Sequence, residues 1–332
     1  MVTSSNIKDT EVELDTKEDK LIDVQRQGGE MKGDMKRPLK NRKSRWLFAN
    51  WWSKDDIDVE PISHLNLNYE LHKPHLMTLE PQHMVQDEII NAYFELLRER
   101  EKHYIVNKQF ENQARHFFMH SEFMEASKKY VKDLKKHPLD RSAEELEALK
   151  SFLLTVSVQL RGNRVDDCEF IYFPTCLDQH WFLFIWSVVD QKVILLDSLR
   201  NDTKNRSLKK MYSTQYYIME RLVPCMMHFV NKERYPEPIK WGKVKQLKNR
   251  PMQTDNDCGI FVCKYVDASL MGLPLEHEKW SKEDVRNFRY RIAWEISKGQ
   301  ARHLPSWSIE WRKKFPRKIG FQLLQDCNTS AC

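Results

Sequence analysis

Residues 253–265 read QTDNDCGIFVCKY, and this stretch decides the fold and the chemistry that we expect of the chain. A thiol, Cys258, stands between an acidic residue and a glycine, and an apolar run follows it. The length and apolar character of that run predict a helix over 258–270 that begins at the thiol. A helix N-terminus and a neighbouring imidazolium both favour the thiolate, which is the nucleophilic form of cysteine. The stretch therefore predicts a cysteine nucleophile at the start of a buried helix.

Two polar side chains upstream would complete such a site. His180 precedes an aromatic run at 181–189, and Asp197 ends a second apolar run at 192–197. Only two residues join the runs, which is the length of a hairpin turn, so we expect neighbouring antiparallel strands. One strand out and one strand back would place His180 beside Asp197 at one edge of the sheet. A cysteine nucleophile needs such an imidazole base, oriented by a carboxylate.

The loop before the thiol supplies a candidate for stabilising the oxyanion. Gln253 carries a side-chain amide, and the backbone N–H of Cys258 is a second donor for the oxygen of an attacked carbonyl. Gly259 would let another segment approach closely. Each residue alone also has an ordinary interpretation: a buried thiol, a satisfied polar histidine, a strand-end aspartate and a surface glutamine. Their combination, in this order and on these elements, favours catalysis.

The remaining elements place the strands between two blocks of helices. Apolar periodicity predicts helices at 84–101, 212–230 and 282–298, with 109–136 helical in part. The segment 143–160 is ambiguous, because it starts like a capped helix and ends with more β-branched residues. Pro224 would kink the helix at 212–230, and Ser281 and Asp284 form a candidate capping box for the helix at 282–298. Further strands are expected at 168–173 and 239–247. Helices, then strands, then helices, without alternation of single strands and helices, indicate an α+β fold.

The composition bounds the class of protein. The chain has 332 residues, a net charge of +6 and no apolar run long enough for a transmembrane helix. Its first 30 residues lack the basic start and apolar centre of a signal peptide, so we expect a nuclear or nucleocytoplasmic protein that is not secreted. The seven cysteines are irregularly spaced, with no CxxC pair, which argues against a disulfide framework and a zinc site. We expect no cofactor and no metal, and the modest charge does not indicate nucleic acid as a partner.

Composition also divides the chain into segments. Residues 1–45 are polar and without aromatics, which predicts a disordered tail. Its basic cluster at 36–45 is either a nuclear address or a solvated stretch. We expect residues 46–74 to be a linker or docking segment, residues 75–300 to be the catalytic domain, and residues 301–332 to be a basic C-terminal extension.

Several separated motifs together resemble one known family. They are His180-Trp181, ILLDS at 194–198, Gln253 followed by DCGIFV at 257–262, DEIINAYF at 87–94 and, more loosely, FFM at 117–119. In this order they resemble the ubiquitin-like-protein-specific cysteine proteases, also called the SUMO or sentrin-specific proteases. The resemblance covers roughly residues 75–300. It implies a papain-like α+β fold, with a central mixed sheet flanked by helices and the nucleophile at a helix N-terminus.

The same resemblance implies roles for individual residues. His180, Asp197 and Cys258 would form the catalytic triad, with Gln253 in the oxyanion hole, and cleavage would follow the C-terminal diglycine of a small modifier. Trp181 would form one wall of the substrate tunnel, where a flat aromatic ring selects an extended peptide without side chains; a core tryptophan is the alternative interpretation.

Two positions depart from the family pattern. Met84 stands where the family commonly has a tryptophan that covers the diglycine, although a methionine can still cover it by apolar contact. Gln253 lies five residues before Cys258, which makes this loop slightly shorter than the family's.

The resulting hypothesis is a thiol protease or isopeptidase, a hydrolase that deconjugates or matures a SUMO-type modifier in the ubiquitin-like conjugation pathway. The same chemistry on a Rub/Nedd-type modifier or on ubiquitin is an alternative, because no surface signature in the sequence separates the modifiers. A catalytically weak modifier-binding scaffold is a second alternative, and the competent residues at all four catalytic positions argue against it. The expected partners are the modifier and its protein conjugates. We expect a monomer without membrane association.

Overall fold

The described part of the structure lies between residues 71 and 301. In this computed structural model the described residues are 71–106, 115–158, 165–188, 190–199, 210–238, 244–247, 249–273, 275, 279–299 and 301. The predicted tail at 1–45, most of the predicted linker and nearly all of the predicted C-terminal extension lie outside these residues.

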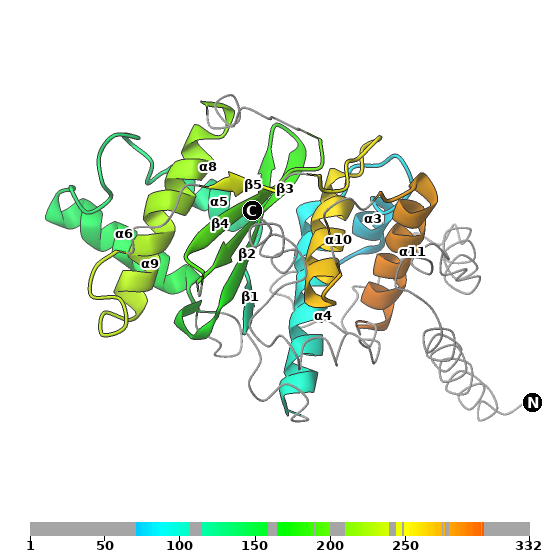
Figure 1. Ribbon diagram of the computed structural model, residues 1–332, viewed down its shortest axis with the longest axis horizontal. Helices are drawn as coiled ribbons and strands as arrows, with labels where there is room; N and C mark the ends of the chain where they lie inside the picture. The colour runs from blue at the N-terminus through cyan, green and yellow to red at the C-terminus, as the bar shows by residue number, and fades with distance from the viewer. Residues whose placement is uncertain are drawn as a thin grey trace, which may run out of the picture. The chain divides into compact units, whose positions relative to one another are not determined.

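A mixed five-stranded sheet forms the centre of the fold (Figure 1), with the strand order β1-β2-β3-β4-β5. The strands are β1 (His116–Phe118), β2 (Phe170–Leu177), β3 (His180–Ser187), β4 (Lys192–Leu196) and β5 (Lys245–Gln246). The three inner strands are antiparallel to one another, whereas β1 and β5 run parallel to their neighbours. Leu183 pairs with Leu196, which places the residue after β4 near the start of β3. The predicted hairpin is therefore confirmed.

The inner strands are apolar on both faces because each face of the sheet has its own core. Successive side chains of a strand point to opposite faces. In β3, one set of alternate residues belongs to the first core, namely Trp181, Leu183 and Ile185. The other set belongs to the second core, namely Phe182, Phe184 and Trp186. This two-sided burial explains why β3 reads as a continuous aromatic and aliphatic run.

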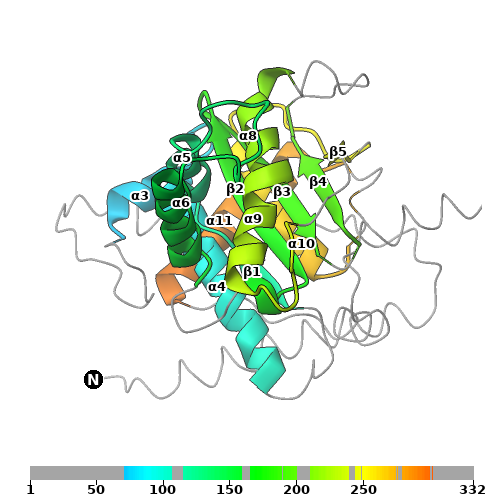
Figure 2. The same cartoon turned by 90° about the vertical axis from the view of Figure 1, so that its left-hand side faces the viewer.

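Helices cover both faces of the sheet. On one side lie α3 (Lys73–Met77), α4 (Asp87–Val106), α10 (Cys258–Leu270) and α11 (Lys282–Lys298), as Figure 1 shows. On the other side, facing the viewer in Figure 2, lie α5 (Glu122–Lys128), α6 (Ala143–Val156), α8 (Ser213–Tyr217) and α9 (Val223–Val230). A 3₁₀ turn, η2 (Val165–Asp167), and a π-helical turn, η3 (Ile218–Leu222), complete the described elements. Helix α10 packs on β3 and contacts both α4 and α11.

Most of the predicted helices are confirmed, and their ends follow the predicted signals. Helix α10 has the predicted bounds, and α11 begins with the predicted capping box, in which Ser281 and Asp284 exchange hydrogen bonds. At the other end of α11, Gly299 adopts the left-handed conformation (φ 65°) that ends many helices. Helix α6 is capped by Ser142, whose side chain accepts a hydrogen bond from the backbone N–H of Glu145.

The structure differs from the sequence predictions in three segments. The segment expected to be partly helical at 109–136 also contains strand β1, which forms by pairing with β2. The helix expected at 212–230 is divided into α8, the π-helical turn and α9. Pro224 is the second residue of α9, which directly follows the π-helical turn, so the helical backbone is irregular where the proline was expected to kink it. In the described part of the segment 239–247, only Lys245 and Gln246 are in a strand.

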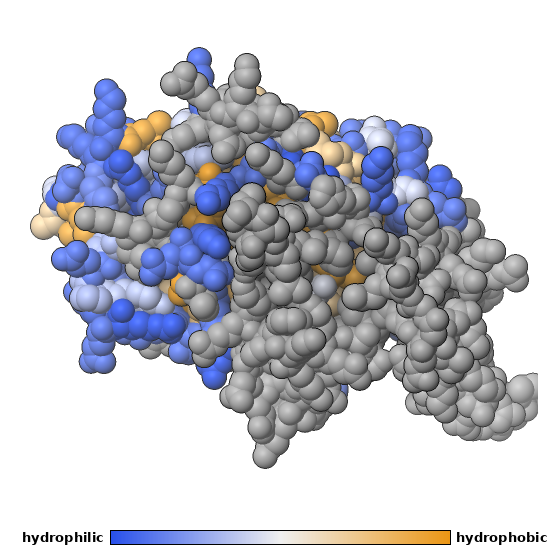
Figure 3. All heavy atoms as spheres, in the orientation of Figure 1, coloured by the Kyte–Doolittle hydropathy of each residue, from blue (hydrophilic) through white to orange (hydrophobic). Residues whose placement is uncertain are grey.

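The described surface is mostly hydrophilic on the face seen in Figure 3, with small separate hydrophobic patches. The large apolar residues that are exposed come from different elements and are Met77, Leu134, Val158, Leu199 and Met211. Among the described helices, none combines the length and the hydropathy that crossing a membrane requires.

Candidate active site

Cys258 is the first residue of α10 and is almost fully buried, with 3% of its surface exposed. The helix can begin this close to the sheet because the next residue has no side chain. A Cβ on Gly259 would lie 3.0 Å from Cβ of Val85 and 3.4 Å from Cδ1 of Trp181. Gly259 therefore lets the start of α10 lie tightly against Val85 and in contact with Trp181, which helps to set the position of the thiol.

His180 begins β3 directly after a tight turn. The two turn residues, Asp178 and Gln179, both have positive φ angles of 51° and 63°, as the central residues of type I′ hairpin turns do. The turn places the carbonyl oxygen of Gln179 at 4.0 Å from Sγ of Cys258. The local chain path thus brings the start of β3 next to the start of α10.

The imidazole of His180 is held by Asp197 on one side and faces the thiol on the other. Nε2 of His180 lies 2.8 Å from Oδ1 of Asp197. Burial lowers the pKa of His180, but the hydrogen bond to Asp197 and the neighbouring Cys258 outweigh it and raise that pKa to about 9. At neutral pH the ring is therefore protonated, with Nδ1 left for the thiol side. The structure brings together the three residues predicted as a triad.

Asp197 is completely buried and is oriented by several donors. Its Oδ2 accepts a hydrogen bond from the hydroxyl of Tyr212 at 2.7 Å, and its Oδ1 accepts one from the backbone N–H of Leu199 at 3.0 Å. Burial alone would raise the pKa of Asp197, but His180 and Tyr212 lower it below its usual value. The carboxylate consequently stays ionised beside the imidazolium.

Gln253 is anchored to the end of β4 through Ser198. Its backbone N–H donates to the carbonyl oxygen of Ser198 at 2.9 Å, and its Oε1 accepts from the Ser198 hydroxyl at 2.6 Å. Because the amide oxygen is engaged in this way, the NH₂ group is the end left to donate. The loop is fixed further by Arg250, whose Nε donates to the carbonyl oxygen of Asp197 at 2.7 Å. Ser198 and Arg250 thus hold this loop against the end of β4, and the oxyanion role of Gln253 stays a prediction.

Trp181 contacts Val85, the residue that follows Met84 in the chain. The indole Nε1 of Trp181 donates to the carbonyl oxygen of Val85 at 3.1 Å, and the half-buried Met84 precedes Val85 in the chain. The Trp181 ring also packs against Gly259. Trp181 therefore borders the start of α10, and the role of Trp181 and Met84 in a tunnel stays a prediction.

Three positioning residues were missed by sequence reasoning. Tyr212 and Arg250 contact Asp197 from 15 and 53 residues away along the chain, and no local sequence pattern predicts contacts over such separations. Ser198 did have a signal, because a small polar residue directly follows the predicted carboxylate at the end of a strand.

The other described thiols differ from Cys258 in their surroundings. Burial raises the pKa of Cys168 and of Cys225 to about 12 and that of Cys176 to about 11. The pKa of Cys263 is raised further by the same cause. These thiols remain protonated at neutral pH, whereas Cys258 faces an imidazolium. Within the described ranges, no group of three or more His, Cys, Asp or Glu side chains is arranged to hold a metal ion.

Residues 83–304 match the family model described as Ulp1 protease family, C-terminal catalytic domain. The chain belongs to the Ulp1 protease family. The resemblance to ubiquitin-like-protein-specific proteases is therefore confirmed.

Curated relatives of this family come from Arabidopsis thaliana. Putative ubiquitin-like-specific protease 1B is 28% identical over 236 residues, which are 71% of this chain and 60% of the relative. Ubiquitin-like-specific protease 1A is 26% identical over 257 residues, which are 77% of this chain and 45% of the relative. The chain thus spans between about half and three fifths of these relatives.

Solved structures of the family share the fold. The Chaetomium thermophilum Ulp1-like SUMO protease catalytic domain superposes with a TM-score of 0.54 at 15% identity, covering 82% of this chain and 95% of that domain. The SUMO protease Ulp1 with its catalytic cysteine oxidised to a sulfenic acid gives a TM-score of 0.51 at 18% identity, covering 80% and 98%. The predicted papain-like α+β fold, with a mixed sheet flanked by helices, is confirmed.

Proposed function

We propose that this chain is a thiol protease or isopeptidase that cleaves after the C-terminal diglycine of a SUMO-type ubiquitin-like modifier. The observation that carries the proposal is the placement of His180 between the Asp197 carboxylate and Cys258 at the start of α10. Membership of the Ulp1 family supports the same reaction.

In the first step, the Cys258 thiolate attacks the carbonyl carbon of the modifier's terminal glycine. The carbonyl electron pair moves to the oxygen, where the NH₂ group of Gln253 and the backbone N–H of Cys258 donate hydrogen bonds. The protonated His180 gives its Nδ1 proton to the nitrogen of the scissile bond. That C–N bond breaks, the amine leaves as a free lysine side chain or peptide, and the modifier remains as a thioester on Cys258.

In the second step, the now neutral His180 takes a proton from water, and the resulting hydroxide attacks the thioester carbon. The C–S bond breaks, Cys258 leaves as the thiolate, and the modifier is released with a free carboxylate. Asp197 holds the ring throughout without taking the proton, which agrees with the lowered pKa of its carboxyl.

The requirement for glycine has a physical basis in the aromatic wall beside the nucleophile. Trp181 is buried against Gly259, and its indole donates to the carbonyl oxygen of Val85, which follows the half-buried Met84. We assign Trp181 and Met84 to the substrate tunnel. An extended chain that passes between flat apolar surfaces has no room for side chains, which a glycine pair does not carry.

The identity of the modifier rests on the relatives. The curated relatives are named as ubiquitin-like-specific proteases, and the two structural neighbours are described as SUMO proteases. We further propose that residues 75–300 form the catalytic domain, that the protein acts as a monomer, and that the basic cluster at 36–45 directs it to the nucleus.

A panel of modifier probes tests this proposal. SUMO, a Rub/Nedd-type modifier and ubiquitin, each ending in a cysteine-reactive electrophile in place of the scissile amide, are incubated with wild-type protein and with Cys258→Ala. We expect rapid adduct formation with the SUMO probe and none with the alanine variant. Exclusive labelling by the Rub/Nedd-type or ubiquitin probe would overturn the choice of modifier. Absence of labelling by every probe would support the scaffold alternative.

A further inference from the structure

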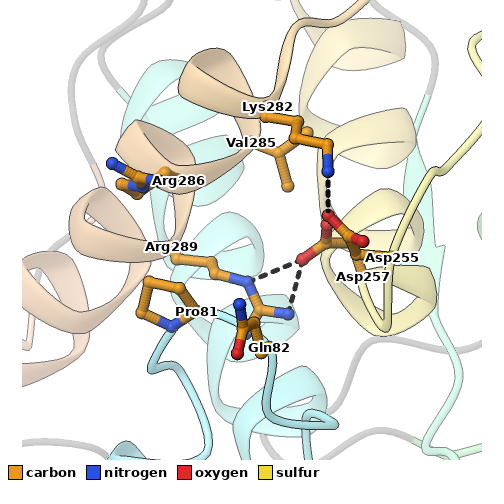
Figure 4. A pocket seen from close by; sticks show the side chains of 8 residues that line it. All are labelled: Pro81, Gln82, Asp255, Asp257, Lys282, Val285, Arg286 and Arg289. Atoms are coloured by element: carbon orange, nitrogen blue, oxygen red, sulfur yellow. Dashed lines mark hydrogen bonds and ion pairs between the residues drawn. The ribbon is translucent and has the colours of Figure 1, made fainter.

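Arg289 lies outside the triad but reaches the residue directly before the nucleophile. It stands on α11 on the same apolar stripe as Val285 and Ile292, and only 1% of its side chain is exposed. Its Nε and Nη2 both donate to Oδ1 of Asp257, at 2.9 and 2.6 Å. Figure 4 shows this pair at the wall of a recess of about 160 Å³.

The remaining hydrogen bonds of Arg289 go to backbone carbonyl oxygens of two loops. Nη1 donates to Thr78 and Glu80 at 3.2 and 3.0 Å. Nη2 donates to His83 and Asn256 at 3.0 and 3.1 Å. One guanidinium therefore fixes both the segment that leads to Met84 and the loop that leads to Cys258.

Asp257 occupies the N-cap position of α10 but does not cap the helix with its side chain. Its carbonyl oxygen accepts the first helical hydrogen bond, from the N–H of Phe261, at 2.9 Å. An aspartate at this position ordinarily accepts a hydrogen bond from an N–H of the first turn. Here the carboxylate is drawn to Arg289 instead, away from the end of the helix.

This diversion matters because the start of α10 is where negative charge develops in the reaction. A capping carboxylate would occupy first-turn N–H groups and place a second negative charge beside the thiolate. Both effects disfavour the thiolate. The carboxylate repels a second negative charge, and it takes the N–H groups that would otherwise stabilise the thiolate at the helix N-terminus. An arginine that binds the carboxylate removes the competitor and neutralises its charge.

We propose that Arg289 is a positioning residue that holds the Asp257 carboxylate off the N-terminus of α10 and so keeps that helix end for the Cys258 thiolate. The inference deepens the proposed function, because it concerns the same nucleophile. It does not depend on which modifier is cleaved.

Other ionisable groups also face the thiol and enter the test. His180 contacts it from β3, with Asp197 behind the ring, and Cys176 lies near it on β2. Asp87, at the start of α4, lies close enough to influence Cys176. None of these groups is altered in the variants below.

The experiment measures the rate at which iodoacetamide alkylates Cys258 as a function of pH, with peptide mapping to separate Cys258 from Cys176. Three variants are compared with wild type: Arg289→Gln, Asp257→Asn and the double variant. The first leaves an unneutralised carboxylate, so the acid limb of the rate should move to higher pH by about 0.5–1 unit. The second leaves an unneutralised guanidinium, so the limb should move to lower pH. The double variant carries neither charge, so its limb should return close to the wild-type position.

Arg100→Gln is the matched control, because Arg100 is an equally buried arginine that pairs with Asp267, nine residues along α10 from Cys258. Arg100→Gln should lower the melting temperature without moving the acid limb of the Cys258 alkylation rate. If Arg289→Gln does not fold, the comparison of Asp257→Asn with the double variant still decides the question, because only the first should move the acid limb to lower pH.

A purely structural role for Arg289 predicts lower melting temperatures in all variants and an unchanged limb, and that result would overturn the proposal. The test also separates this inference from the proposed function. Wild-type Cys258 that is no more reactive than Cys176 contradicts the nucleophile itself, whereas a reactive Cys258 with unshifted variants contradicts only the role of Arg289.

Discussion

Both ends of helix α10 hold an aspartate paired with a buried arginine, but the two pairs are built differently. At the start of α10, Arg289 donates two hydrogen bonds to one carboxylate oxygen of Asp257, and its other N–H groups donate to backbone carbonyl oxygens. Near its end, Asp267 is bound by two arginines from other helices. Its Oδ1 lies 3.0 Å from Arg100 of α4, and its Oδ2 lies 2.9 Å from Arg291 of α11.

The difference separates two tasks within one helix. Asp267 is 1% exposed and joins three helices through side chains alone, a network that Glu295 extends by binding Arg291 at 2.6 Å. Such a network stabilises the packing of helices and touches no reacting atom. The contacts at the start of α10 instead set the path of the backbone around Cys258. We therefore expect substitutions at the start to change reactivity and substitutions near the end to change stability.

Apart from removal of the thiol, the largest effect on turnover is expected at Asp197, which holds the His180 ring that faces Cys258 at the start of α10. Asp197→Asn keeps the shape of the side chain but no longer stabilises the imidazolium or its tautomer. We expect kcat on a SUMO precursor to fall by about 10³–10⁴-fold with little change in KM. Steady-state kinetics measure this, with the exposed Asp140→Asn as control. A loss confined to KM would place Asp197 in substrate binding instead.

The comparison predicts the opposite outcome at the far end. Asp267→Asn leaves Arg100 and Arg291 buried beside a neutral amide, which should lower the free energy of unfolding by about 3–5 kcal/mol. Urea unfolding measures the loss, and kcat per folded molecule should stay within about twofold, which is the scale of a change below 0.5 kcal/mol. An unchanged unfolding midpoint with a large loss of kcat would break the proposed division.

The two ends should also respond to opposite extremes of pH. The pKa of His180 is raised to about 9 from its ordinary 6.5, so the stabilisation from its charged form is complete below pH 6.5 and is lost as the pH rises through about 9. Activity that needs the imidazolium should decline about tenfold per pH unit above that value.

The carboxyl of Asp267 behaves in the opposite sense. Burial alone would raise its pKa, but Arg291 and Arg100 lower it. Its contribution to stability is therefore present above pH 3.8 and is lost as the pH falls through the lowered value. A pH profile of kcat/KM, with thermal melts at the same pH values, tests both groups. A loss of activity near pH 6.5 on the alkaline side would contradict the raised pKa of His180.

The smallest effect is expected from the support of Asp197. Tyr212→Phe removes a single hydrogen bond to the carboxylate, and such a bond to a charged acceptor is worth about 1.5–3 kcal/mol. Part of this energy should appear as a higher activation free energy. We expect a loss of about tenfold in kcat. Tyr217→Phe is the control, since its hydroxyl donates to the carbonyl oxygen of Lys136 and does not reach the triad. Equal losses in both variants would show that Tyr212 acts only through stability.

The sequence revealed those parts of the site that depend on short-range pattern. His180 and Asp197 belong to one hairpin, so their spacing alone predicts that they meet, and the apolar run after Cys258 predicts the helix that carries it. Arg289 reads in sequence as a charged residue interrupting an apolar stripe, and its partner Asp257 lies 32 residues away. Strand β1 was missed for the same reason, because its three residues form a strand only by pairing with β2, more than fifty positions along the chain.

The most direct test of the account is the site at which a SUMO diglycine electrophile reacts. Wild-type protein is labelled at neutral pH, digested and mapped by mass spectrometry. We predict a stoichiometric adduct on Cys258 and none on Cys176, the half-buried thiol beside it, whose pKa is raised to about 11. An adduct on Cys176, or labelling that survives in Cys258→Ala, would contradict the assignment of the nucleophile at the start of α10.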